Sequence, residues 1–351
     1  MKKLLFISLA VILALSVSLI GCEGEGEEPV WDGPIALQMH CTISDRASVV
    51  EFVYQPWVEA VQALNGTLGG TFNITVTYGD APFDATTSLS AISSGVVDIG
   101  QLSPDTFHLG SLGYLPWLFP SIESTAYTMH KLLRDEVETW DENGELDGVK
   151  ILLASPLWPA EYWGHSVNVT TVDTIAGLKI RAEGAESATI QAFNATPTYI
   201  ATSDLSGALQ SHIIEGLFFT YSGIGGFSGV GPNCAYVTEL DMFFRPYMLA
   251  MNKASYDALP AEARTALDSV CTAAKSVELA TAHLAGMAGD RADTLAAKGI
   301  YVPTAGELAD WKAATVSANL TGEWIAYMTD PLGFDGQGIY DRALALIAAT
   351  P

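Results

Sequence analysis

Residues 260–298, PAEARTALDSVCTAAKSVELATAHLAGMAGDRADTLAAK, form the most unusual stretch of the 351-residue chain. Pro260 suits the first turn of a helix. Apolar residues then recur mostly every three or four positions, at Leu267, Val270, Ala274, Val277, Ala280, Leu284, Ala288 and Leu295. One helix of this length spans about 50 Å, more than a small domain. The stretch therefore predicts a single, straight or bent helix that crosses two domains; the alternative is two helices that break near Gly286–Gly289.

The rest of the chain alternates between strand-like and helix-like patterns. Period-two alternation and short apolar runs predict strands over residues 35–41, 72–78, 97–102, 149–154, 162–169, 178–182 and 300–302. Helical spacing predicts helices over 49–64, 89–96, 185–194, 205–214 and 307–328. Strands that alternate with helices predict α/β layers around mostly parallel sheets.

More than one such α/β unit fits into a chain of this length, which favours two lobes. We expect lobe I at residues 34–155 with part of about 240–285, and lobe II at residues 156–239. The spanning helix at residues 260–298 and a C-terminal strand and helices at residues 299–351 complete the organisation.

The first 22 residues have the pattern of an export signal. Met1-Lys2-Lys3 is basic, residues 4–20 are apolar, and the run ends at Leu19-Ile20-Gly21-Cys22 without flanking charges. This predicts a signal peptide over residues 1–21. Its ending resembles the lipobox of bacterial lipoproteins, in which Cys22 becomes the lipid-modified first residue. We expect an acidic Gly/Glu tether at residues 22–33 and an extracytoplasmic protein with a lipid anchor at Cys22. A plain anchor helix with an incidental Cys is the alternative.

Charge and cysteine content exclude several classes of protein. Acidic residues outnumber basic ones by 40 to 16, a formal net charge of −24. Nucleic-acid binding needs Lys and Arg to replace counterions, so no nucleic-acid partner is expected. Cys41, Cys234 and Cys271 are odd in number and widely spaced, which fits neither a disulfide framework nor a zinc site. We expect three buried small side chains; one bridged pair is the alternative.

The sequence contains no catalytic or cofactor motif. The six histidines are scattered, with no pair at helical spacing. Gly226-Phe227-Ser228-Gly229 is followed by Val230, so the last glycine of a nucleophile elbow is missing. The Gly-rich stretch 223–231 also lacks the final glycine of a dinucleotide motif, and no Walker sequence occurs. We therefore expect no cofactor, no metal and no enzymatic activity.

Three stretches, taken in order and spacing, resemble one known family. They are SGVVDIG at 94–100 followed by LPWLF at 115–119, AGLKIR at 176–181, and GALQSHIIEG at 207–216. They are similar to the solute-binding proteins of TRAP (tripartite ATP-independent periplasmic) transporters, and the long helix matches that family's domain-spanning helix. The resemblance extends from about Ile35 to about Tyr327.

The resemblance implies an α/β fold with two lobes, like that of periplasmic binding proteins. It also implies a small organic-acid ligand in the cleft between the lobes and delivery to the membrane permease subunits of a TRAP transporter. Two alternatives are a binding protein that serves a sensor or another transporter, and an exported enzyme on the same scaffold.

Arg181 ends the Gly-Leu-Lys-Ile-Arg motif, whose arginine holds the ligand carboxylate in that family. A planar guanidinium offers two parallel donors that match the two oxygens of a carboxylate. The residues alone support this in part, because Arg181 ends an apolar strand at a turn, where α/β proteins place ligand sites. The alternative is an arginine paired with Glu183 or Glu186 on a solvated edge.

The sequence departs from the family at two places. Many relatives carry a further arginine where residues 162–168 here contain none, and relatives often have Asn or Trp near the position of Phe219. We therefore expect one arginine in an aromatic-lined pocket, which suits a monocarboxylate with an apolar or aromatic body. Ordinary core packing is the alternative for Phe219. His165 could replace the missing cation, although a strand histidine without this role is favoured. The candidate ligand-binding residues are Arg181, Phe219, Tyr221, Trp158, His165, Ser103 and His40.

Overall fold

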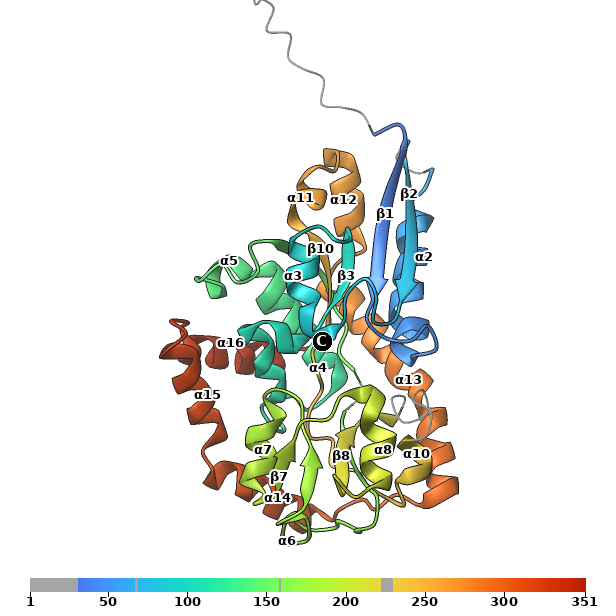
Figure 1. The fold of residues 1–351 in the computed structure, drawn as a ribbon. Helices are drawn as coiled ribbons and strands as arrows, with labels where there is room; N and C mark the ends of the chain where they lie inside the picture. Colours follow the sequence, from blue (N-terminus) through green and yellow to red (C-terminus); the bar gives the residue numbers. More distant parts are fainter. Residues whose placement is uncertain (1–30, 67–68, 158, 222–229) are drawn as a thin grey trace, which may run out of the picture.

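The computed structural model describes residues 31–66, 69–157, 159–221 and 230–351, so the expected signal peptide, Cys22 and Trp158 lie outside the described residues. Two five-stranded sheets form the centres of two lobes (Figure 1). The lobe I sheet has the order β2 (Thr71–Tyr78), β1 (Pro34–Cys41), β3 (Ile99–Leu102), β10 (Met248–Asn252), β4 (Val149–Ala154). The lobe II sheet has the order β7 (Thr196–Thr198), β6 (Lys179–Arg181), β8 (Gly216–Phe219), β5 (Glu161–Gly164), β9 (Tyr236–Thr238).

Both sheets are mixed, but in each of them four of the five strands run in the same direction, which agrees with the expectation of mostly parallel sheets. In lobe I, β1 pairs in parallel with β2 and β3, whereas β10 is antiparallel to β3 and β4. In lobe II, β6 pairs in parallel with β7 and β8, whereas β5 is antiparallel to β8 and β9. The strand that runs against the other four is β5 in lobe II and β10 in lobe I, and each follows directly after a segment that passes between the lobes.

Strand β10 is buried on both faces. Met248 and Ala250 belong to one hydrophobic core, which also contains Ile151. Leu249 and Met251 belong to a second core on the other face. A strand with both faces covered is apolar throughout, and β10 accordingly lacks the polar–apolar alternation that marks the edge strand β2.

Helices cover the sheets. The helices besides those described below are η1 (Val50–Tyr54), α2 (Gln55–Ala63), η2 (Ala85–Thr87), α3 (Ser88–Ser93), η3 (Pro104–Thr106), η4 (His108–Tyr114), α4 (Ile122–His130), η5 (Lys131–Asp135), α5 (Val137–Trp140), α6 (Val172–Ile175), α7 (Glu186–Ala192), η6 (Thr202–Asp204), α8 (Leu205–Gln210), α10 (Val230–Asn233) and α11 (Lys253–Asp257). None of the helices in the described part of the chain is long and apolar enough to cross a membrane.

Residues 260–298 form two helices, α12 (Ala261–Ser269) and α13 (Ala273–Lys298). The expectation of one helix is therefore wrong, and so is the alternative break near Gly286, because α13 continues through it. The break follows from Thr272, whose side chain accepts a hydrogen bond from the Lys275 backbone N–H and starts a new helix. Gly286 instead permits close packing: a Cβ there would lie 2.3 Å from the Phe52 ring of η1.

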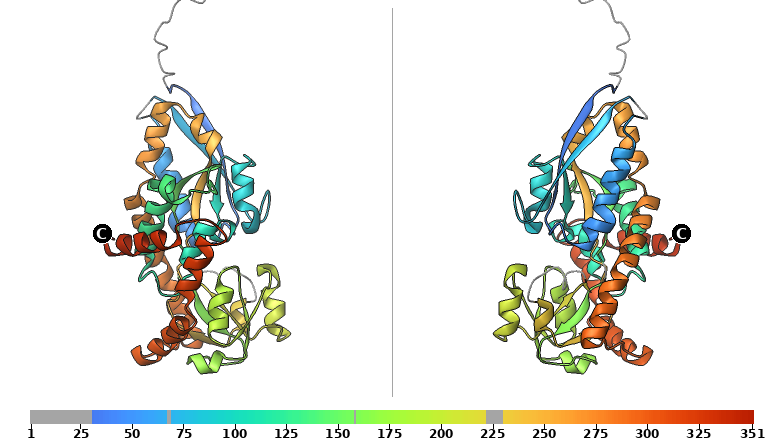
Figure 2. Two further views of the ribbon diagram at one scale, coloured as in Figure 1. Left: turned by 90° about the vertical axis from the view of Figure 1, so that its left-hand side faces the viewer. Right: turned by 90° about the vertical axis from the view of Figure 1, so that its right-hand side faces the viewer.

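Helix α13 crosses both lobes (Figure 2). Its 26 residues span about 40 Å. The first half packs against α4, η1 and β4 of lobe I. Further along, Met287 enters a core of lobe II, and Arg291 donates from Nε and Nη2 to both oxygens of Glu239 at 2.5 and 2.6 Å. A single helix thus contributes to the cores of both lobes.

Two further segments cross between the lobes, residues 155–160 after β4 and residues 239–247 before β10. They run side by side, joined by backbone hydrogen bonds from Ser155 N to Tyr247 O at 2.7 Å and from Ala160 N to Phe243 O at 3.0 Å. With α13, three crossing segments connect the lobes.

The C-terminal region differs from its prediction in detail. The expected helix over residues 307–328 is two helices, α14 (Ala305–Ser317) and α15 (Leu320–Thr329), because Asn319 adopts a left-handed backbone conformation between them. The expected strand at residues 300–302 is a single bridge between Tyr301 and Thr238. Helix α16 (Gly336–Ala348) returns to pack against α4 of lobe I.

Two other sequence expectations can be compared directly with the structure. The expected strand over residues 162–169 is shorter, since β5 ends at Gly164. Cys41, Cys234 and Cys271 are all buried and free, as the favoured interpretation of the cysteines expected.

Candidate functional site

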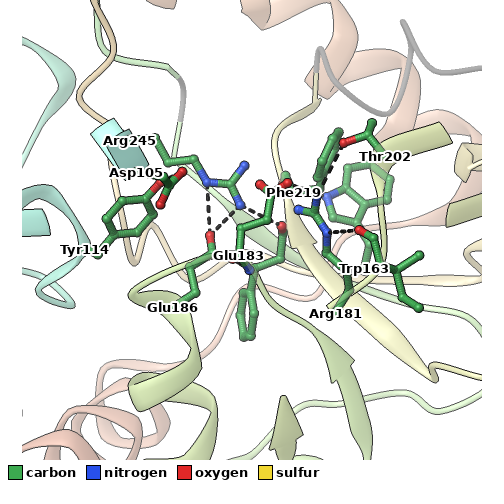
Figure 3. A network of polar contacts seen from close by, with 11 residues as sticks. Asp105, Tyr114, Trp163, Arg181, Glu183, Glu186, Thr202, Phe219 and Arg245 are labelled. Carbon is green, nitrogen blue, oxygen red and sulfur yellow. Dashed lines mark hydrogen bonds and ion pairs between the residues drawn. The ribbon is translucent and has the colours of Figure 1, made fainter. Parts of the chain in front are cut away.

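Arg181 lies at the carboxyl end of β6, facing lobe I, and its side chain is completely buried (Figure 3). Its Nε donates to the backbone oxygen of Ile200 at 3.3 Å, and its Nη2 donates to Thr202 Oγ1 at 3.4 Å and to Glu183 Oε1. Nη1 is buried and has no hydrogen-bond partner among the described residues. The pairing with Glu183 matches the alternative expectation, but the arginine does not lie on a solvated edge.

A second arginine, Arg245, lies beside the first. It comes from the crossing segment 239–247 and is 5% exposed. The guanidinium carbons of Arg181 and Arg245 lie 5.8 and 5.9 Å from the centre of the Phe219 ring, within range of cation–π attraction. A second cation thus lies near Phe219, and it comes from a crossing segment instead of residues 162–168.

Arg245 is held by Glu186, the first residue of α7. Nε of Arg245 donates to Glu186 Oε1 at 3.0 Å, Nη2 donates to the same oxygen, and Nη2 also donates to the Phe218 backbone oxygen at 3.2 Å. Burial raises the pKa of Glu186, and Arg245 opposes this. Burial also acts to lower the pKa of Arg245, but Glu186, Tyr114 and Glu183 together outweigh it and hold that pKa above its usual value. The two groups therefore form a buried ion pair.

Lobe I contributes Asp105, which lies in η3 opposite the arginines. Tyr114 donates its hydroxyl hydrogen to Asp105 Oδ2 at 2.9 Å. Desolvation raises the pKa of Asp105, and the hydrogen bond from Tyr114 opposes this. Gly184 of lobe II has a positive φ of 47°, and a Cβ there would lie 2.3 Å from Asp105 Oδ1. Glycine thus allows the turn after β6 to touch lobe I.

A pocket of about 370 Å³ opens beside this contact. Both lobes line it, and its lining includes Asp105, Phe107, His108, Tyr114, Gly184 and Tyr327. The lining therefore includes several aromatic rings, whereas neither Arg181 nor Arg245 is among the lining residues.

The structure brings some of the sequence candidates to this region. Phe219 is buried between the arginines and the core of lobe II. Ser103 is buried beside Asp105, caps η3, and hydrogen-bonds Tyr247. Tyr221 packs its ring against Trp163 at 5.5 Å and donates to Glu239 Oε1 at 3.1 Å, so it lies deeper in lobe II.

Two candidates lie away from the arginines. His165 follows β5 at the end of the sheet opposite Phe219, where its Nδ1 contacts the Asn233 backbone oxygen and its ring packs against His212. His40 is completely buried, with Nδ1 bonded to Thr77 at 2.9 Å and Nε2 bonded to the Phe83 backbone oxygen at 3.1 Å. Each of the two imidazole rings therefore contacts residues of its own lobe. Trp158 lies outside the described residues.

Sequence reasoning missed Arg245 and Asp105. Arg245 was detectable, since it stands in the apolar run Phe243-Phe244-Arg245-Pro246-Tyr247 of a chain with only 16 basic residues. A cation in such a run is buried with a partner or serves a site. Asp105 carried no comparable signal among 40 acidic residues.

The chemistry of the cluster is recognition of charge. Two guanidinium groups lie near the Phe219 ring, and the carboxyls of Glu183, Glu186 and Asp105 lie near these guanidinium groups (Figure 3). Within the described ranges, no group of His, Cys, Asp and Glu side chains could hold a metal ion.

Two α/β lobes joined by three crossing segments, with charged side chains between them, are the architecture of a two-lobed solute-binding protein. Residues 46–319 match the model of "Bacterial extracellular solute-binding protein, family 7" (DctP). The chain belongs to this family, and the resemblance to TRAP solute-binding proteins is confirmed.

Solved structures of TRAP solute-binding proteins share this fold. One from Rhodoferax ferrireducens, in complex with copurified benzoate, has a TM-score of 0.79 and 24% identity over 90% of this chain and 98% of the other. A marine metagenome protein specific for aromatic acid ligands, in complex with metahydroxyphenylacetate, has a TM-score of 0.79 and 22% identity over 90% and 99%. A Bordetella bronchiseptica protein with bound (R)- and (S)-mandelate has a TM-score of 0.74 and 18% identity over 91% and 100%.

Proposed function

We propose that this protein is the extracytoplasmic receptor of a TRAP-type secondary transporter, which captures a carboxylate-bearing organic solute and delivers it to membrane permease subunits. Arg181 carries the proposal. It stands at the family's carboxylate-binding position, and its buried Nη1 has no hydrogen-bond partner among the described residues. A buried donor without a partner is costly, and a ligand carboxylate would satisfy it.

The neighbours of Arg181 favour a monocarboxylate with an aromatic or apolar body. Arg245 is committed to Glu186 and so does not offer a second carboxylate site. Phe219 and the rings of Phe107, Tyr114 and Tyr327 supply apolar surface for the body of the ligand. Benzoate, metahydroxyphenylacetate and mandelate, the ligands of the three similar proteins, each combine one carboxylate with one aromatic ring.

Capture would proceed by closure of the lobes about the three crossing segments. A lipid on Cys22 and the tether at residues 22–33 would hold the body at the membrane beside the permease subunits. An ion gradient would supply the energy of transport, so the receptor itself needs no nucleotide, metal or catalytic group.

Ligand-dependent thermal stability tests the proposal. A ligand that binds only the folded state raises the midpoint of unfolding with its concentration. Benzoate or mandelate is expected to raise the midpoint, whereas benzamide, which lacks the carboxylate, and succinate, which carries two, should raise it less. An equal rise with benzoate and benzamide would contradict recognition through a carboxylate. Native mass spectrometry of protein purified without denaturation then identifies any ligand that copurifies.

A further inference from the structure

The terminal nitrogens of Arg181 differ in what they already bind. Nη1 is buried and has no hydrogen-bond partner within the described part of the chain, whereas Nη2 donates to Glu183. Nη1 and Nη2 together form the end-on fork that matches the two oxygens of a carboxylate. The contacts of Nη2 with Glu183 Oε1 and with Thr202 Oγ1 already use its two hydrogens, so a ligand carboxylate that uses this fork must displace one of these two partners.

Glu183 can leave this position more easily than its neighbours can move. Its side chain is 28% exposed, whereas the side chain of Arg181 is 0% exposed. It follows Arg181 by two residues, on the turn next to Gly184, so a change of its own rotamer suffices to release the contact. Glu186, three residues further on, is completely buried against Arg245 and has no such route.

We propose that Glu183 is a competitor built into the binding site, whose carboxylate holds Nη2 of Arg181 and is displaced when the ligand carboxylate binds. This inference rests on the proposed role of Arg181 and adds a residue that sets affinity and specificity. Displacement exchanges one carboxylate for another, so the charge beside Arg181 is conserved.

Electrostatics argues for exchange over simple addition. Two carboxylates on one guanidinium, away from water, repel each other strongly. Asp105 and Glu186 already supply negative charge near Arg181 and Glu183. Because Glu183 is attached to the same chain, its effective concentration at Arg181 is high. A bare carboxylate such as acetate therefore competes poorly, and a ligand needs body contacts, such as those with Phe219, to win.

The proposed competition predicts the direction in which substitutions of Glu183 change the affinity for a carboxylate ligand. Removing the charge of Glu183 removes the competitor, so Glu183→Gln is expected to strengthen carboxylate binding by about tenfold, the scale of a partly exposed ion pair. Glu183→Asp shortens the reach to Arg181 and should strengthen binding by a smaller factor. Asp173→Asn is the matched control, because it also removes one negative charge from lobe II but lies exposed on α6; it should leave affinity unchanged.

Titration calorimetry on the parent protein and these three variants tests the inference. The probes are benzoate, metahydroxyphenylacetate and mandelate, and benzamide is the uncharged comparison. Circular dichroism first checks that each variant is folded. If Glu183→Gln does not fold, Glu183→Asp is the variant that tests the inference. Stronger binding of the acids, but not of benzamide, to both Glu183 variants supports displacement.

Acid binding that is unchanged or weaker in the Glu183 variants overturns this inference. Arg181→Ala separates that result from failure of the proposed function. If Arg181→Ala weakens acid binding while the Glu183 variants gain nothing, only the competitor role fails. If acid binding is indifferent to Arg181→Ala, or no acid binds any of the proteins, the carboxylate-binding role of Arg181 fails, and the competitor role with it.

Discussion

Two arginine–glutamate pairs lie close together between the lobes, and they are built differently. Arg245 and Glu186 are 59 residues apart in the chain, both are buried, and two nitrogens of the arginine meet one glutamate oxygen. Arg181 and Glu183 are two residues apart, one nitrogen makes the contact, and the glutamate reaches solvent. The first pair fixes a crossing segment to α7, whereas the second can exchange its partner without moving either lobe.

Breaking the buried pair should have the largest effect. Glu186→Ala leaves the Arg245 guanidinium buried without its partner, and such a change costs about 3 to 5 kcal/mol of unfolding free energy. Urea denaturation measures it. The same substitution at the partly exposed Glu183 should cost about 1 kcal/mol or less. Equal losses at the two glutamates would show that the pairs are equivalent.

Removing Arg181 should weaken ligand binding more than it weakens the fold. Loss of a charge-assisted bidentate contact strands the ligand carboxylate, so Arg181→Ala is expected to reduce the affinity for an acid such as benzoate about a hundredfold. Arg181→Lys should retain only part of the affinity that Arg181→Ala loses, because an ammonium group cannot reproduce the two parallel donors of a guanidinium. Calorimetry with the acid and its amide checks the cause: if both lose affinity equally, Arg181 is a structural residue.

A further carboxyl, that of Glu161, has no arginine partner among the described residues and extends the comparison to pH. Glu161 is completely buried at the start of β5; its Oε2 accepts hydrogen bonds from the backbone N–H groups of Leu240 and Asp241, and its Oε1 has no partner among the described residues. Burial raises the pKa of Glu161 well above its usual value, and the charges of Asp241 and Glu239 add to the rise. Arg291 is bound to Glu239.

Because the folded state holds the proton of Glu161 more tightly than the unfolded state does, stability falls as the pH rises above about 4.5. Glu161→Gln cannot ionise and fills the position with a neutral amide. The variant should match the parent near pH 4 and exceed its unfolding free energy by on the order of 1 kcal/mol at pH 8. Thermal unfolding across this pH range measures the difference, and parallel curves for the two proteins would contradict the raised pKa.

The smallest effect is expected at His165. Its ring contacts Asn233 and His212 at the end of the lobe II sheet opposite Phe219. His165→Ala should therefore leave the affinity for benzoate within about twofold of the parent. A loss above tenfold in the same titration would mean that the ligand carboxylate lies far from Arg181.

Sequence reasoning reached the parts of the fold that have a local signal. The alternation in Phe72–Tyr78 predicts a strand with one face towards solvent, and β2 forms there. Arg181 was found because a family motif ends at it. The break at Thr272 was missed, because apolar residues keep their helical spacing across it and one capping hydroxyl decides the outcome.

The remaining part of the site depends on contacts between distant residues. Arg245 reaches Arg181 only through the path of a crossing segment, and Asp105 reaches Gly184 only when the lobes meet. β10 was missed for a related reason. It is buried on both faces, so its residues show no period, and its neighbours β3 and β4 lie about a hundred residues or more earlier in the chain.

The central place of β10 sets the order in which an exported chain can fold. Emerging from a translocation channel amino end first, the chain releases all five strands of lobe II before Met248–Asn252 appear. Until then, β3 and β4 lack the strand that joins them, and their apolar faces stay open. The sheet of lobe II can therefore form before the sheet of lobe I is complete. The exposure of β3 and β4 to proteases and aggregation therefore lasts until Met248–Asn252 have crossed.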